Sequence, residues 1–68
     1  MSFVIVFDIP RSEQTERRRI HRELTKHDCQ MIQDSFWKSQ DLKFLMSLGM
    51  KIKKIGGSAT ILEERFLF

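Results

Sequence analysis

The sequence predicts an α+β fold in one domain that spans residues 1–68. A short, unbroken apolar run near the start is typical of a strand, and two later segments carry apolar residues at helical spacing. The expected order along the chain is strand, helix, strand, helix, strand. Because a chain of this length buries only about 60% of its unfolded surface, we expect it to gain stability by self-association.

The run from Phe3 to Phe7 is the strongest strand signal, and a carboxylate follows it directly. Its β-branched and aromatic residues predict a central strand that is buried on both faces. Pro10 cannot donate a hydrogen bond to a sheet, so the strand ends before it. Asp8 therefore lies at the carboxyl edge of the strand. It is either a functional carboxylate or a residue that starts a turn or caps the next helix.

A first helix is expected after Pro10. Ser12 is its predicted N-cap, and the helix runs to about residue 27. Its apolar stripe is narrow and consists chiefly of two residues, Ile20 and Leu24. Such a helix covers one face of a sheet and shows a basic side to solvent.

Residues 29–39 predict extended structure that is interrupted in the middle. Asp34 and Ser35 break the apolar pattern, which indicates a bend or two short strands that meet there. Trp37 is the only tryptophan, and we expect it to pack in the core or at an interface, with stacking on a nucleobase as the alternative.

Asp41 is the predicted cap of a second helix, whose end is ambiguous. Gly49 is one candidate end. The alternative, which we favour, is a longer helix that reaches residue 55 and stops at Gly56-Gly57. Residues 58–68 then form the last strand. The apolar residues at its end are Phe66, Leu67 and Phe68. They need a cover, and a second subunit is one candidate.

The formal charge of +3 and the pI of about 9.4 permit nucleic-acid binding without demonstrating it. Basic residues cluster in each expected helix, although a charged helix face is usually only solvated. The clusters are Arg17, Arg18, Arg19, Arg22 and Lys26, and then Lys51, Lys53 and Lys54. We interpret His21 and His27 as surface or boundary residues.

Cys29 is the only cysteine, which excludes an internal disulfide and fits a reducing, cytoplasmic setting. A zinc site made from one cysteine and two distant histidines is not expected. No apolar stretch is long enough to span a membrane, so we expect no membrane partner.

The predicted elements fit a ferredoxin-like βαββαβ arrangement with two helices on one face of an antiparallel sheet. The strand ending in Phe7-Asp8-Ile9-Pro10, the helix with arginines and Gln33-Asp34-Ser35-Phe36-Trp37 resemble the CRISPR-associated Cas-two family. The resemblance covers about the first 40 residues. The sequence departs from the family where Phe7 replaces the common Tyr and Phe36-Trp37 replace Val-Phe, and no acidic residue follows Trp37.

The resemblance implies a ferredoxin-like homodimer with the Asp8 of each subunit near the two-fold axis. It also implies a role in antiviral defence, as the non-catalytic bridge between DNA and the Cas-one integrase during spacer acquisition. Some family members are described as metal-dependent nucleases for RNA or DNA. We expect this chain to lack the final strand that members exchange with the partner subunit. Similar features occur in virulence-associated protein D ribonucleases and in the C-terminal domains of PaaX-type transcriptional repressors.

An endonuclease activity would place Asp8 as the catalytic residue and as the ligand of Mg²⁺, which accepts one or two carboxylates and keeps several waters. One Asp8 makes a thin site, whereas two brought together by a two-fold axis would suffice. The guanidinium groups of Arg17, Arg18 and Arg22 would neutralise phosphate. The hydroxyl of Ser35 would form a hydrogen bond with phosphate or backbone. Because Asp8 is the only evident general base, the non-catalytic function is at least as well supported as the enzymatic one.

Overall fold

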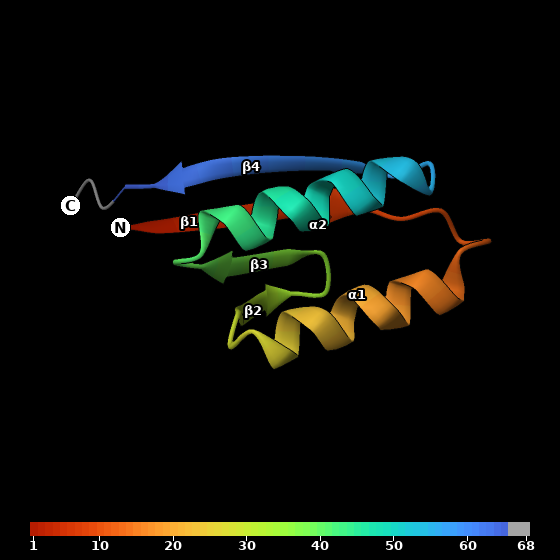
Figure 1. Cartoon of the computed structure of the whole chain (residues 1–68), viewed down its shortest axis with the longest axis horizontal. Helices are drawn as coiled ribbons and strands as arrows, with labels where there is room; N and C mark the ends of the chain where they lie inside the picture. The colour runs from red at the N-terminus through yellow and green to blue at the C-terminus, as the bar shows by residue number, and fades with distance from the viewer. Residues whose placement is uncertain (66–68) are drawn as a thin grey trace.

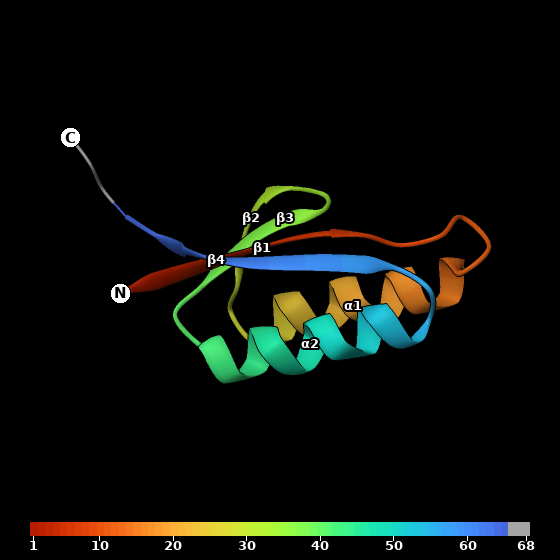
Figure 2. The ribbon, with the colours of Figure 1, turned by 90° about the horizontal axis from the view of Figure 1, so that it is seen from above.

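The computed structural model describes residues 1–65, so the predicted strand residues 66–68 lie outside it. Its elements are β1 Ser2–Asp8, α1 Gln14–Lys26, β2 Gln30–Gln33, β3 Phe36–Ser39, α2 Leu42–Lys54 and β4 Ser58–Glu64. The strands form one antiparallel sheet in the order β2-β3-β1-β4. Both helices lie on the same side of this sheet (Figures 1 and 2). The predicted ferredoxin-like α+β fold is therefore confirmed.

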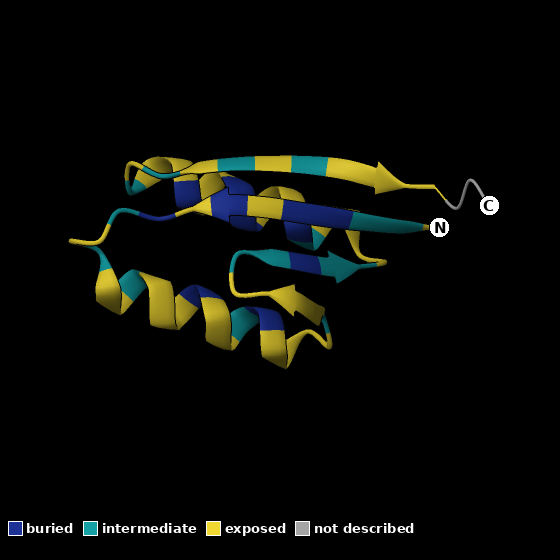
Figure 3. Cartoon of the chain, turned by 180° about the vertical axis from the view of Figure 1, so that it is seen from behind, coloured by how far each residue is buried: buried dark blue, intermediate teal, exposed yellow. Residues whose placement is uncertain are grey.

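Strand β1 lies inside the sheet between β3 and β4, as its apolar run predicts. Its side chains alternate between the two faces, so Ile5 and Phe7 point toward the helices and are buried. The prediction of burial on both faces is wrong for Val6, which is 39% exposed. No helix in the described part of the chain covers that second face, which is turned toward the viewer in Figure 3.

Helix α1 begins later than predicted, because the chain turns after Pro10. The backbone N–H of Glu13 donates to the carbonyl of Pro10 at 2.9 Å, and Glu13 takes the N-cap position without a side-chain hydrogen bond. Ser12 stays in the turn, so its predicted role as the cap is wrong. The narrow apolar stripe is confirmed, since Ile20 and Leu24 are the buried residues of the helix.

Helix α2 has the predicted cap and the longer of the two predicted lengths. The carboxylate of Asp41 accepts a hydrogen bond from the backbone N–H of Phe44 at 3.0 Å. Gly49 is buried inside the helix and faces Ala59 and Ile61 of β4. The turn that follows requires glycine: Gly56 has φ +88°, and a Cβ on Gly57 would clash with the carbonyl oxygen of Asp8.

The middle segment is a hairpin of two short strands, one of the two structures predicted for it. Asp34 and Ser35 form its turn, and the pairing shifts register between Met31 and Gln33. Trp37 is 3% exposed and its Nε1–H donates to the carbonyl of Asp34 at 2.9 Å. The expectation of core packing is confirmed, and burial leaves the indole no face for a nucleobase.

A candidate nucleic-acid interface on helix α1

One side of α1 carries a row of cations. Arg18, Arg22 and Lys26 are exposed and recur every four residues, which places them one above the other on the helix. Four residues of α-helix rise by about 6 Å. None of the three has an ion-pair partner within residues 1–65. We call these three residues the α1 cation row.

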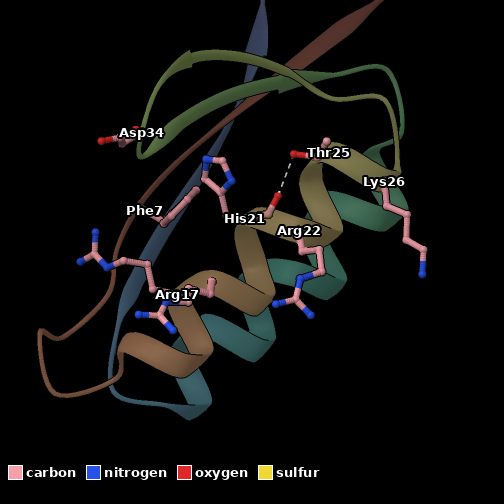
Figure 4. A pocket seen from close by; sticks show the side chains of 8 residues that line it. Phe7, Arg17, His21, Arg22, Thr25, Lys26 and Asp34 are labelled. Carbon is pink, nitrogen blue, oxygen red and sulfur yellow. Dashed lines mark hydrogen bonds between the residues drawn. The ribbon is translucent and has the colours of Figure 1, made fainter.

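A groove of about 710 Å³ runs between the α1 cation row and the tip of the β2–β3 hairpin. Figure 4 shows its lining: the basic side chains come from α1, Phe7 projects from β1, and Asp34 lies at the hairpin tip. His21 stands between α1 and the hairpin. The fold therefore places the basic side chains of α1 beside two rings, His21 of the same helix and Phe7 of β1.

Arg17 also lines the groove, but part of its guanidinium has a structural partner. Its Nη2–H donates to the carbonyl of Ile9 at 2.9 Å in a partly buried hydrogen bond. This bond ties α1 to the segment that follows β1. Arg19, by contrast, pairs with Glu16 at 3.0 Å and is not among the groove residues.

His21 is held by an aromatic contact. Its ring lies edge to face with the buried Trp37, with centroids 5.0 Å apart and an angle of 87° between the planes. The sequence interpretation of His21 as a surface residue is correct as to exposure but missed its place in the groove. The available signal was its spacing of three and four residues from Arg18 and Arg17, which puts these side chains on one side of a helix.

The fold separates Asp8 from the predicted arginines. Asp8 is exposed at the end of β1, pairs with Ser58 of β4 and is not among the groove residues. Because successive side chains of β1 point to opposite faces of the sheet, Asp8 lies on the same face as Val6, whereas Phe7 faces the groove. We call this second face, which no helix in the described part of the chain covers, the bare face of the sheet. Arg17, Arg18 and Arg22 are brought together, and Asp8 points away from them.

Ser35 lies in the hairpin turn, half-buried and next to β1. Its carbonyl accepts a hydrogen bond from the backbone N–H of Phe7 at 3.0 Å. This contact fixes the hairpin against β1. Its hydroxyl as a phosphate ligand stays a prediction, as do the roles of Asp8 and the arginines.

One chain provides only a thin site for Mg²⁺. Within residues 1–65, no three His, Cys, Asp or Glu residues come close enough to hold a metal ion together. Mg²⁺ accepts one or two carboxylates and fills its remaining positions with water, so one Asp8 would make a thin site and a second Asp8, from another copy of the chain, would complete it.

Cys29 is a poor candidate for a nucleophile. Burial raises the pKa of its thiol; a hydrogen bond with Ser39 acts in the opposite direction, and the carboxylates of Asp41 and Asp28 add to the rise. A raised pKa leaves little thiolate at neutral pH.

In the part of the chain that the structure describes, no helix is long and apolar enough to cross a bilayer.

The fold and the groove define a small ferredoxin-like domain with one basic helix face. Residues 1–59 match the family model of CRISPR associated protein Cas2, so the chain belongs to this family, the Cas-two family that its first 40 residues resemble. A CRISPR-associated function follows from this membership. A comparison with curated proteins found no match.

Proposed function

We propose that this protein is a nucleic-acid-binding homodimer of the CRISPR adaptation machinery, where it bridges DNA and the integrase during spacer acquisition. The observation that carries the proposal is the α1 cation row, which borders a groove and has no ion-pair partner within residues 1–65. Cations in such a row neutralise phosphates without reading the sequence. The lone cysteine fits a cytoplasmic setting.

The dimer is supported by the bare face of the sheet. Register pairs Val6 with Phe36 and Val4 with Leu62, which gathers apolar side chains around β1. Leu62 is 53% exposed. Burying a large apolar side chain fully stabilises a protein by about 1.5–3 kcal/mol, so a second copy placed on this face would add appreciably to a small core.

One end of the same face is polar. Lys38 of β3 and Glu64 of β4 form an ion pair at 3.0 Å, which passes over β1 because β1 lies between those strands. An apolar centre with a polar rim is the usual anatomy of a protein interface. In a two-fold dimer both copies would use this one face, and the two Asp8 residues would share it.

A Mg²⁺-dependent endonuclease is the second candidate, and the place of Asp8 on the bare face favours it. Bound between two Asp8 carboxylates, Mg²⁺ would supply polarisation of a phosphodiester and a more acidic water. However, phosphates held by α1 lie on the opposite side of the sheet from Asp8 of the same chain. This separation supports the non-catalytic bridge as the first candidate.

The variant Asp8→Asn distinguishes the two candidates, with Asp28→Asn as a control that removes a carboxylate elsewhere. Fluorescence anisotropy with labelled DNA measures binding, and gel analysis with Mg²⁺ and DNA or RNA measures cleavage. We expect all three proteins to bind alike and none to cleave. Cleavage by the wild type and the control, lost only in Asp8→Asn, would establish the nuclease instead.

Sedimentation equilibrium at micromolar concentration tests the dimer. Leu62→Glu places a charge on the bare face, and Met50→Glu places the same charge at a 66% exposed position of α2. We expect dimers for the wild type and for Met50→Glu, and a monomer of 8.1 kDa for Leu62→Glu. A monomeric wild type would refute the dimer and the shared Asp8 site.

A further inference from the structure

The groove beside α1 contains aromatic side chains in addition to the cations that would bind a duplex backbone. Phe7 and His21 present ring carbon to it, so one part of its lining is aromatic and another is basic. In duplex DNA the faces of the bases are stacked inside the helix, and only base edges and phosphates are accessible. Aromatic surface in such a groove matches the face of a base that is not stacked in a duplex.

The His21 ring is pre-oriented for such a contact. Trp37 holds it edge to face, and Trp37 is itself fixed by burial and by its hydrogen bond to the carbonyl of Asp34. The perpendicular arrangement leaves at least one face of the imidazole uncovered by the indole. A ring that is already ordered loses little conformational entropy when a base stacks on it.

Size and spacing agree with this use. The groove volume of about 710 Å³ lies within the range of roughly 300–1,000 Å³ that is typical of sites for small organic groups. The cations of the α1 row rise by about 6 Å from one to the next, which is close to the separation of consecutive phosphates along one strand. A strand that follows α1 would place its phosphates on the row and turn a base into the groove.

We propose that this groove holds an unpaired nucleobase, so that the protein prefers single-stranded nucleic acid, or an unpaired end, to a fully paired duplex. The inference rests on the proposed function, because the α1 cation row must first hold the backbone. His21 acts as the stacking platform, and Phe7 closes the inner end of the groove.

Two labelled DNA probes of equal length test this: a single-stranded thymidine oligonucleotide and a fully paired duplex, at the same salt concentration. We expect tighter binding of the single strand. His21→Ala should weaken single-strand binding roughly tenfold, the loss typical of one stacked base, and leave duplex binding unchanged. His21→Phe, which keeps an aromatic face, should restore the preference.

A third probe needs no variant of the protein. A single strand of abasic sites keeps the phosphates and lacks the bases, so the wild type should bind it about as weakly as the duplex. Equal, salt-sensitive binding of all three probes would overturn the base site and leave the proposed function standing. Absence of salt-sensitive binding to any probe would overturn both.

Discussion

Helices α1 and α2 have the same length of 13 residues and lie on the same side of the sheet, but they contribute unequally to the buried core. Helix α1 buries two residues, and α2 buries four: Leu45, Leu48, Gly49 and Ile52. Buried apolar area is the main source of stability. Helix α2 is therefore the structural helix, whereas the outer side of α1 is left free to bind.

The cations of the two helices differ in the same way. Three of the four lysines of α2 lie in its last turn, where positive charge complements the helix dipole, and one of them, Lys51, pairs with Glu23 at 3.0 Å. Those of the α1 row run along the groove without ion-pair partners among the described residues. The placement of charge, more than its amount, separates a stabilising helix from a binding helix.

The largest expected effect is on the core side of α2. Leu45 is fully buried, so Leu45→Ala should lower the free energy of unfolding by about 2–5 kcal/mol. Arg22→Ala, on the exposed side of α1, should change it by no more than about 0.5 kcal/mol. Urea unfolding followed by circular dichroism measures both. Equal losses in the free energy of unfolding would contradict the claim that α2 stabilises the fold more than the exposed side of α1 does.

The caps of the two helices give a smaller contrast. Asp41→Ala removes the hydrogen bond to the N–H of Phe44 and should cost about 1 kcal/mol. Ser12→Ala should have no measurable effect, because α1 has no side-chain cap. The same urea titration compares them. A loss for Ser12→Ala as large as that for Asp41→Ala would show that Ser12 does cap α1.

The link between the helices should matter least. Glu23→Gln removes the ion pair with the more exposed Lys51, and water and salt screen such a pair. We expect a loss of about 0–1 kcal/mol that disappears when the salt concentration is raised. Thermal unfolding at low and high salt measures it. A large loss that salt does not reduce would show that the pair stabilises the packing of α1 on α2.

Features of the fold that depend on neighbouring residues were predictable. The apolar run predicts β1, Asp41 predicts the start of α2, and Asp34-Ser35 predicts the break between β2 and β3. The place of Ser12 in the turn was not predictable, because the hydrogen bond from the N–H of Glu13 to the carbonyl of Pro10 fixes the turn and the position of the first helical residue. Local pattern alone does not distinguish a cap from a turn residue.

The site was less predictable, because it depends on contacts between distant elements. The arginines could be assigned to one helix, but His21 joins the groove only when the hairpin brings Trp37 over α1. The separation of Asp8 from the arginines did have a signal. Phe7 and Asp8 are consecutive residues of a strand, and consecutive residues face opposite sides of a sheet.

The salt dependence of DNA binding tests most directly the claim that α1 is the binding helix. Two triple variants lose the same charge: Arg18→Ala, Arg22→Ala and Lys26→Ala on α1, and Lys51→Ala, Lys53→Ala and Lys54→Ala on α2. Each phosphate contact contributes about 0.7–0.9 to the slope of log K against log salt concentration. We expect the α1 variant to lower the slope by about two to three units and the α2 variant to keep the wild-type slope. An equal reduction in both, or an unchanged slope in the α1 variant, would contradict the account.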